Sequence, residues 1–467
     1  MARLRTLLIL LVAGAVLALS LSSGCMTDPV TGKRSLGVIN PSDDEEVLQG
    51  RQYAPSFTAE FDGAYPDREV QDYLAGIVLR LGSASHRPSL PYRFTLLNSS
   101  VPNAFALPGG EVFATRGLVA RLEEEAQFAV VLGHEVGHVN HRHSVQAMND
   151  ALVVGLGTSL LAGGLKDERD REVASGLASM GGGLLLLRFS REQETEADDR
   201  GAEYAYAAGY DPRRGARVFE EFARMKRESG AGGGPFESWL SSHPLDEDRV
   251  RHLRAEVARR WPALRGEASA PGLVVTTPAW DATVARLRGA QPRYERMDRA
   301  RAAAAKALQK GDGSGAQKAL RVVEEEGRAL PDHALFPAVE GAILHALGDR
   351  RAARERLSRA VRLQPDLYFA RVRLAVLDND DGRHAEAAAG ARAAADLAPS
   401  SAEARMLLGR ALEGGGHRKE AIAAYEAAAR VAASGSAEER AALRRLAELE
   451  PEEYGVQDRG KGKKQKR

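Results

Sequence analysis

The sequence His134-Glu135-Val136-Gly137-His138 places two histidines four residues apart, with a glutamate beside the first. Apolar side chains recur at helical spacing around it and no proline intervenes, so a helix is predicted over 122–148. Residues four apart share a helix face, so both imidazoles can bind one metal ion. Glu135 is then placed to take a proton from a metal-bound water. The pattern indicates a metal-dependent hydrolase, although a helix with surface histidines would have the same letters.

A third ligand is expected downstream, where 190–198 reads Ser-Arg-Glu-Gln-Glu-Thr-Glu-Ala-Asp and predicts a helix to about Ala208. Glu194 and Asp198 share a face, so one can complete a His-His-Glu site and the other can hold an imidazole N–H. Glu196 is the rival ligand, but it points about 200° around the helix from Glu194. His141 lies too far along its own helix and is expected to be solvated or outside the ligand shell. An acidic, solvated helix is the alternative for 190–198.

These two motifs, with Asn103-Ala-Phe-Ala-Leu-Pro-Gly-Gly110 before them, resemble the gluzincin peptidases that include the HtpX, CAAX-prenyl and BepA-type endopeptidases. The resemblance covers about residues 28–260. It implies a zinc metalloendopeptidase with one Zn²⁺ per chain and a mainly α (α+β) domain with a small β-sheet. Carried over by motif position, the zinc ligands are His134, His138 and Glu194, the general base is Glu135, and Asp198 supports a ligand.

Ser241-Ser242-His243-Pro244 also resembles the soluble branch of that family, and Pro244 favours an extended backbone at His243. His243 could donate to the oxyanion of a tetrahedral intermediate, or occupy the open zinc position and keep the enzyme latent. Its alternative role is to lead into a helix. We expect His243 to assist or gate catalysis.

Two further segments are expected near the zinc site. Val112–Thr115 reads as a strand, and an exposed edge there would let an extended polypeptide add as a further strand, although core packing explains the pattern nearly as well. The apolar stretches 151–165 and 173–187 would each reach about 22 Å as helices, short of a hydrocarbon core of about 30 Å. A helical hairpin that covers the active site is favoured over one that dips into the lipid surface.

The first 24 residues read as a signal peptide, with Arg3 and Arg5 before an uncharged stretch. Ser22-Ser23-Gly24-Cys25 resembles a bacterial lipobox except at Ser22, where Leu is usual, and contains the only cysteine of the chain. The resemblance implies a lipid anchor on Cys25, with ordinary secretion as the alternative. Met26 after the cysteine favours the outer membrane, with the protein facing the periplasm.

A 34-residue period marks the C-terminal third, with glycine, alanine and proline series that predict an α-solenoid of tetratricopeptide (TPR) repeats: Gly348, Gly382, Gly416; Ala353, Ala387, Ala421; Ala360, Ala394, Ala428; Pro331, Pro365, Pro399. Four stacked helix pairs and a capping helix over 438–449 are expected. Such repeats form a concave protein-docking surface, and a stabilising scaffold is the alternative.

The chain of 467 residues, 44% apolar, predicts two or three folded domains and excludes disorder throughout. Its net charge of +1 disfavours nucleic-acid binding. The expected organisation is a lipoprotein signal peptide (1–24), a zinc metallopeptidase domain (25–265), a linker or connecting element (266–299), TPR repeats (300–450) and a basic flexible tail (451–467).

The favoured function is a lipid-anchored endopeptidase that degrades misfolded or stalled cell-envelope proteins. Its repeats would recruit substrate or an outer-membrane assembly machine. The alternative is a non-proteolytic TPR adaptor or chaperone with a structural metal site. The intact Glu135 favours the enzyme, since metal retention alone needs no base beside the ligands.

Overall fold

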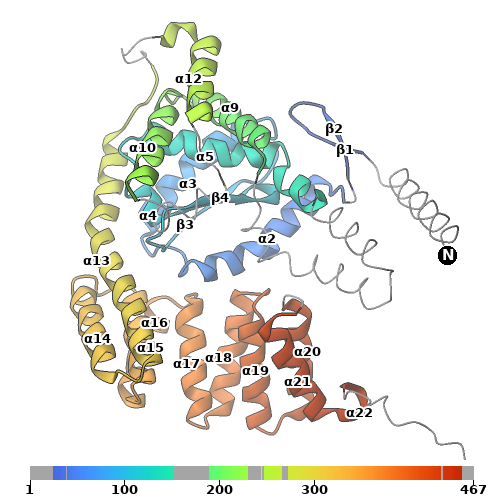
Figure 1. Ribbon diagram of the computed structural model, residues 1–467, viewed down its shortest axis with the longest axis vertical. Coiled ribbons are helices and arrows are strands. Elements are labelled where there is room, and N and C mark those ends of the chain that lie inside the picture. The colour runs from blue at the N-terminus through green and yellow to red at the C-terminus, as the bar shows by residue number, and fades with distance from the viewer. Residues whose placement is uncertain are drawn as a thin grey trace, which may run out of the picture. The chain divides into compact units, whose positions relative to one another are not determined.

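A computed structural model describes residues 25–37, 39–150, 189–229, 243, 247–265, 272–432 and 435–454 (Figure 1). Over these residues the protein is mostly helical with two small sheets, which confirms the mainly α class. Contacts divide the described chain between Ala300 and Arg301 into two units. Among the described helices, none combines the length and apolarity needed to cross a membrane. The signal peptide and the predicted 151–187 hairpin lie outside the described residues.

The first unit opens with an antiparallel hairpin of β1 (Cys25–Thr27) and β2 (Arg34–Leu36), followed by helices α2 (Asp43–Glu60) and α3 (Arg68–Ser83). A three-stranded sheet comes next, with β3 (Arg93–Leu97), β4 (Ala104–Leu107) and β5 (Glu111–Thr115). The 3-10 turn η1 (Pro108–Gly110) joins β4 to β5, and short helix α4 (Arg116–Val119) follows. A Cβ at Gly109 would lie 2.4 Å from the Val47 Cα, so only glycine allows this turn to approach α2.

The strand predicted at Val112–Thr115 exists as β5, and of its two interpretations core packing is confirmed, while an exposed edge is excluded. The strand order is β3-β5-β4, so β5 is the central strand, and all five of its residues are buried. It pairs in parallel with β3 and antiparallel with β4. β3 and β4 are the outer strands, and Leu97 of β3 also bridges to Ala64. A polypeptide that added to this sheet would therefore have to add beside β4 or β3.

The catalytic-motif helix is α5 (Glu125–Asn140), and it packs along α9 (Arg191–Ala207). Small residues let the two backbones touch: a Cβ built on Gly133 would lie 2.8 Å from the Gly201 carbonyl oxygen, and one on Gly137 would lie 3.0 Å from that of Ala197. The predicted start of α9 is confirmed, and in the structure Ser190 and Gln193 form a capping box there. Helices α10 (Arg214–Ser229) and α12 (Glu247–Arg260) and the turn η3 (Pro262–Leu264) complete this side of the unit.

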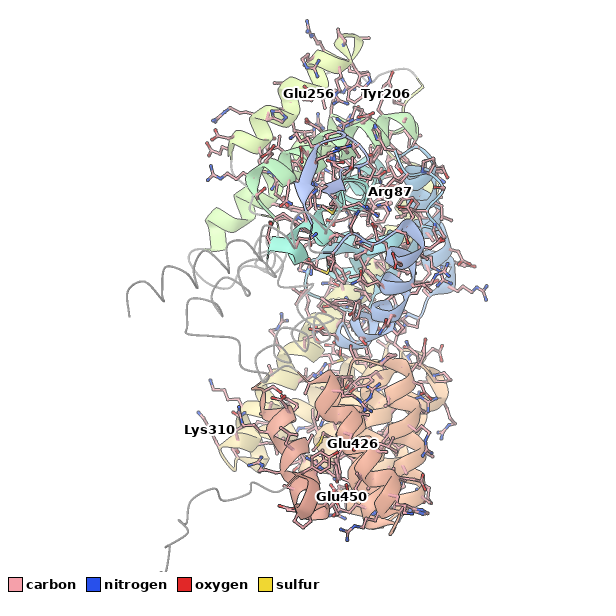
Figure 2. The ribbon with its side chains drawn as sticks, turned by 90° about the vertical axis from the view of Figure 1, so that its right-hand side faces the viewer. Arg87, Tyr206, Glu256, Lys310, Glu426 and Glu450 are labelled. Carbon is pink, nitrogen blue, oxygen red and sulfur yellow. The ribbon has the colours of Figure 1, made fainter. Side chains whose placement is uncertain are left out.

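The helix predicted over 122–148 breaks at Asn140. Arg142 has a φ of 59°, and a helical segment resumes at His143. Tertiary contacts hold this turn, since Arg142 pairs with Glu46 and donates to the Pro41 carbonyl. Arg87, which is labelled in Figure 2, donates to the Val139 carbonyl at 2.9 Å and to Glu46. The end of α5 is thus fixed by residues of α2 and of the loop after α3.

Residues 278–299 of the predicted linker or connecting element are helical and belong to α13 (Pro278–Gln309). Buried Trp280, Val284, Leu287 and Tyr294 follow helical spacing along the first-unit part of α13. Gly289 and Pro292 hid this period in the sequence. The Trp280 indole donates to the Glu123 carbonyl at 3.2 Å, which fixes this part of the helix to the loop before α5.

The second unit is a row of antiparallel helices joined by short turns (Figure 1). After the end of α13 come α14 (Gly313–Arg328), α15 (Leu335–Ala346), α16 (Arg350–Leu363), α17 (Tyr368–Asp380), α18 (His384–Leu397), α19 (Ala402–Gly414), α20 (Arg418–Val431), α21 (Ala437–Leu449) and α22 (Pro451–Tyr454). Gly348, Gly382 and Gly416 have φ of 88°, 72° and 81° in the turns within pairs. The periodic alanines at 353, 387 and 421 are 0% exposed. The predicted TPR solenoid is confirmed, and its period comes from turn glycines and closely packed alanines.

Candidate metal centre

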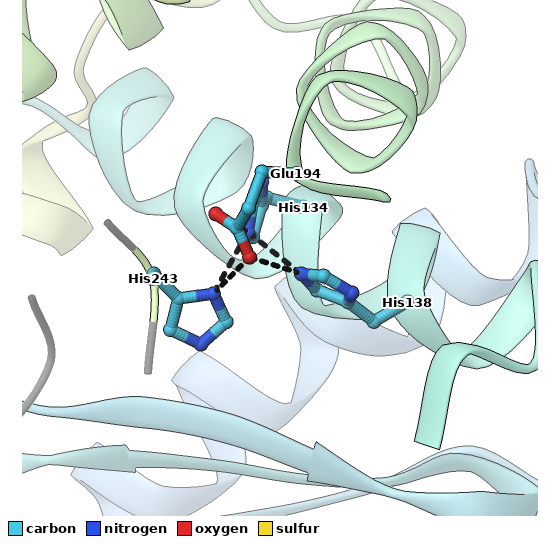
Figure 3. A group of neighbouring side chains, drawn as sticks. All are labelled: His134, His138, Glu194 and His243. Atoms are coloured by element: carbon cyan, nitrogen blue, oxygen red, sulfur yellow. Dashed lines mark hydrogen bonds and ion pairs between the residues drawn. The ribbon is translucent and has the colours of Figure 1, made fainter. Parts of the chain in front are cut away.

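Four buried side chains from three parts of the chain converge in the first unit: His134, His138, Glu194 and His243 (Figure 3). His134 Nε2 lies 3.0 Å from His138 Nε2 and 3.3 Å from His243 Nδ1. Glu194 Oε1 lies 3.0 Å from His243 Nδ1 and 3.4 Å from His138 Nε2. The structure thus places Glu194 with the two motif histidines and adds His243 as a fourth donor.

The donor set fits a divalent transition metal. Tetrahedral ligands at 2.0–2.1 Å from zinc are about 3.3 Å from one another, close to the spacing of these donor atoms. The three imidazole planes cross steeply, at 79°, 69° and 56°, so their in-plane lone pairs can point at one centre. Three imidazoles and one carboxylate are ligands that zinc and its neighbours accept.

The charges of the cluster favour a cation. Burial lowers the pKa of His138 well below its ordinary value, which keeps this imidazole in the neutral, ligating form. Burial alone would raise the pKa of Glu194, but the charge of His243 and hydrogen bonds from His138 and His243 hold it well below the usual range. Burial would lower the pKa of His243, yet the carboxylates of Glu194 and Glu135 raise it. The centre therefore attracts positive charge, as a proton or as a metal ion.

Glu135 and His243 are neighbours. The Glu135 side chain is 1% exposed, and its Oε1 lies 3.7 Å from His243 Nε2. Since His243 Nδ1 faces Glu194, the His243 ring lies between the predicted base and the predicted ligand. His243 is thus placed beside the metal centre, where both of the roles expected for it would be exercised.

A second layer of charged groups supports the cluster. Asp198 Oδ1 lies 2.8 Å from His134 Nδ1, so Asp198 accepts the imidazole N–H and leaves His134 Nε2 to face the centre. Arg249 of α12 donates to both Asp198 oxygens at 2.9 Å and reaches Glu194 Oε2 at 2.6 Å. Burial would raise the pKa of Asp198, but Arg249 and His134 lower it, so the carboxylate stays ionised.

Sequence reasoning missed Arg249, although a signal was present. Arg249 lies on the face of α12 that also buries Val250, Leu253 and Val257. A charge on the apolar face of a helix needs a buried partner.

Two other expectations can be compared with the structure. Glu196 lies outside the four-residue cluster and contacts His143 and Lys33. His141 is 0% exposed and hydrogen-bonded to Asp28 at 2.8 Å, so it is not solvated, and it lies outside the four-residue cluster, in agreement with the other alternative. Sequence reasoning also missed His143. The backbone of Cys25 lies in β1, while its side chain is outside the described part of the structure.

Comparison with known proteins fits this geometry. The Beta-barrel assembly-enhancing protease of Escherichia coli (strain K12) is 30% identical over 223 residues, which is 44% of each chain. The Mitochondrial metalloendopeptidase OMA1 of Arabidopsis thaliana is 30% identical over 171 residues, 37% of this chain and 33% of that protein. The chain thus matches less than half the length of either relative.

Among solved structures, MamA from Desulfovibrio magneticus RS-1 is 22% identical and covers 34% of this chain and 86% of its own, but its TM-score of 0.29 is too low to support a conclusion. The model of Peptidase family M48 matches residues 68–257. This range contains α5, α9 and all four residues of the cluster. Residues 68–257 of this chain are therefore a Peptidase family M48 domain.

Proposed function

We propose that this protein is a zinc-dependent endopeptidase that cleaves misfolded or stalled proteins of a bacterial cell envelope. The observation that carries the proposal is the buried cluster of His134, His138 and Glu194 with Glu135 beside it. A metal held only for structure would need no buried carboxylate next to its ligands. The M48 domain and its metalloendopeptidase relatives support the same reaction class.

The roles follow from the contacts. His134, His138 and Glu194 would hold zinc, which when bound polarises the scissile carbonyl and lowers the pKa of a water molecule. Asp198 keeps the proton of His134 on Nδ1, and Arg249 fixes Glu194 and Asp198 together. Glu135 takes a proton from the attacking water and delivers it to the nitrogen of the leaving amine.

His243 supplies a latent state in this proposal. Its Nδ1 is within 3.3 Å of His134 Nε2 and 3.0 Å of Glu194 Oε1, which suits a fourth ligand better than an oxyanion donor. Unlike the other three ligands, His243 belongs to neither α5 nor α9. Its departure would open a coordination position for water while three ligands remain.

The substrate class and location are inferred from several sources. A relative is named for enhancing β-barrel assembly, and Ser22–Cys25 resembles a lipobox. We therefore place the protein at the outer membrane, anchored through Cys25 and facing the periplasm. The TPR solenoid would recruit unfolded envelope proteins or an assembly machine, as such helical surfaces do for protein ligands.

The test is cleavage of casein by zinc-loaded protein comprising residues 26–467. Glu135→Gln should lose at least about 10²–10⁴-fold in turnover and still bind zinc. Glu192→Gln, an exposed change on α9, is the matched control and should behave as wild type. His243→Ala should cleave at least as fast as wild type if His243 is a removable ligand. Zinc-bound wild type and His243→Ala that both leave casein intact would instead support the non-proteolytic adaptor.

A further inference from the structure

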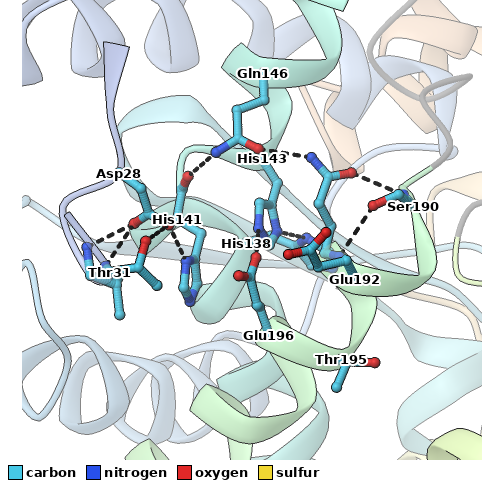
Figure 4. A network of polar contacts seen from close by, with 12 residues as sticks. Asp28, Thr31, His138, His141, His143, Gln146, Ser190, Glu192, Thr195 and Glu196 are labelled. Carbon is cyan, nitrogen blue, oxygen red and sulfur yellow. Dashed lines mark hydrogen bonds and ion pairs between the residues drawn. The ribbon is translucent and has the colours of Figure 1, made fainter. Parts of the chain in front are cut away.

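A second group of potential metal ligands adjoins the first, made of His141, His143 and Glu196 (Figure 4). Their ligand atoms lie within 4.8 Å of one another, and both histidines are buried. His143 Nδ1 is 2.8 Å from His138 Nδ1, so this group contacts the metal centre directly. It could be a second metal site or a support for the first.

Ring geometry argues against a second metal. The lone pair of an imidazole nitrogen lies in the ring plane, so a shared ion must lie near the planes of both rings. His141 and His143 are stacked, with planes 12° apart and centroids 5.0 Å apart. The planes of the three histidines in the first cluster instead cross at 56° or more.

The tautomers of His138 and His143 also argue against a second metal ion. If His138 binds metal through Nε2, its proton is on Nδ1, and this N–H faces His143 Nδ1. His143 must then accept at Nδ1 and carry its own proton on Nε2. That Nε2 is 3.4 Å from Glu196 Oε2 and acts as a donor, so it has no lone pair left for an ion.

We propose that His143 and Glu196 are positioning residues that hold His138 in the ligating tautomer and orientation. The chain of contacts runs from His138 Nδ1–H to His143 and from His143 Nε2–H to Glu196. Lys33 of the N-terminal hairpin donates to the other oxygen of Glu196 at 3.1 Å. The inference rests on the proposed role of His138 as a metal ligand. Partners of this kind fix ligand orientation and raise ligand basicity.

The backbone is arranged for this contact. On an uninterrupted helix His138 and His143 would point about 140° apart. The turn at Arg142, with its positive φ, brings the two rings together, at a centroid distance of 4.9 Å. Phe189 stacks on His138 at 4.1 Å, so the ring is held on its face as well as at Nδ1.

Glu196 is suited to be the last acceptor in this series of hydrogen bonds. Its Oε2 faces His143 Nε2 at 3.4 Å, and its Oε1 accepts a hydrogen bond from Lys33 at 3.1 Å. Lys33 also forms an ion pair with Glu192 at 2.9 Å, and this contact is exposed.

The test measures zinc affinity in the absence of substrate, by competition with a chromogenic chelator. His143→Ala should bind zinc about 10–100-fold more weakly and change the visible spectrum of the cobalt-loaded protein. His143→Gln should recover much of the affinity, because its amide oxygen can accept from His138 Nδ1–H. Glu196→Gln should have a smaller effect. His252→Ala is the matched control, since His252 forms an imidazole–carboxylate pair with Asp199 at 3.0 Å outside the centre.

Two results would overturn the inference. One is wild-type affinity and an unchanged cobalt spectrum in His143→Ala. The other is two metal ions per wild-type chain, falling to one in His143→Ala, which would establish a second metal site. If His143→Ala does not fold, His143→Gln and Glu196→Gln carry the test. Casein cleavage plays no part in the readout, so failure of the proposed protease activity is recognised separately.

Discussion

Arg249 shows how much of the centre depends on one side chain outside the motif. It is 4% exposed and pairs with both Glu194 and Asp198. Arg249→Leu would remove a buried cation that pairs with two buried carboxylates, so we expect metal-free protein to lose about 3–5 kcal/mol of unfolding free energy. The stability of Arg249→Lys should be intermediate, because an ammonium group cannot donate to both carboxylates with the geometry of the planar guanidinium. Denaturant unfolding measures both.

Zinc should reduce this loss, because the ion supplies positive charge to the same carboxylates. Arg254→Leu, on the same helix but 60% exposed at its side chain, should change stability by less than about 0.5 kcal/mol. Equal stabilities of the Arg249→Leu and Arg254→Leu proteins without metal would contradict the structural role of Arg249.

The residues that sequence reasoning found are those joined by local spacing. His134 with His138, and Glu194 with Asp198, are each four apart on one helix, so periodicity alone places each pair on one face. The partners of His141 and Arg249 are remote: Asp28 lies 113 residues from His141, and Asp198 lies 51 from Arg249. A local sequence pattern cannot reveal contacts between residues that lie so far apart along the chain.

Between elements, the contact of α5 with α9 sets the spacing of the ligands. A Cβ on Gly201 would lie 2.8 Å from the His134 backbone nitrogen, which cannot move without shifting α5. Gly201→Ala should therefore cost about 1–3 kcal/mol and weaken zinc binding. Gly289→Ala is the control, because nothing lies within 4 Å of its Cβ and alanine favours a helix. Wild-type zinc affinity in Gly201→Ala would show that the helices can separate at no cost to the site.

Helix α12, which carries Arg249, is braced by acid-sensitive contacts. A hydrogen bond from Arg259 lowers the pKa of Glu256 to about 2, with a further contribution from Arg260, although burial opposes both. The folded pKa is below the unfolded one, so the stabilisation is complete above about pH 5 and is lost as pH falls towards 2. Glu256→Gln should destabilise metal-free protein by up to about 1 kcal/mol at pH 7, and the difference should shrink below pH 5.

Urea unfolding from pH 7 to pH 4 measures this dependence. A Glu256→Gln difference that stays constant over that range, or one that persists when Arg259 and Arg260 are both replaced by Gln, would contradict the assignment.

Element boundaries were predictable where the signal is local. The start of α9 at Ser190 was predicted, and a capping box forms there, whereas the break at Arg142 depends on Glu46 and Pro41 about a hundred residues away along the chain. The order of strands is equally non-local, which is why the sequence left both an exposed edge and core packing open for β5. Helix α13 was missed because Pro292 and Gly289 obscured the spacing of its buried face.

For the whole molecule, we expect a substitution in one unit to change the stability of that unit and not of the other. Gly382 has a φ of 72° in the turn between α17 and α18, so Gly382→Ala should destabilise the repeat unit by about 1–2 kcal/mol. Gly313→Ala, at the start of α14, has only the end of the Leu347 side chain within 4 Å of its Cβ and should be neutral or slightly stabilising. Calorimetry should show a lower melting temperature for the unfolding transition of the repeat unit and no change in that of the other unit. Loss of zinc affinity in Gly382→Ala would contradict this independence.

The N-terminal hairpin limits how far from the membrane surface the proposed enzyme could act. Asp28 holds His141 and Lys33 holds Glu196, so the strand that begins at Cys25 is fastened to residues beside the metal centre. From Cys25 to Asp28 the chain spans only about 10 Å. Acyl groups on Cys25 would therefore leave almost no slack between lipid and the M48 domain. The protease would then reach only those parts of a polypeptide that come close to the membrane surface, however long the substrate is.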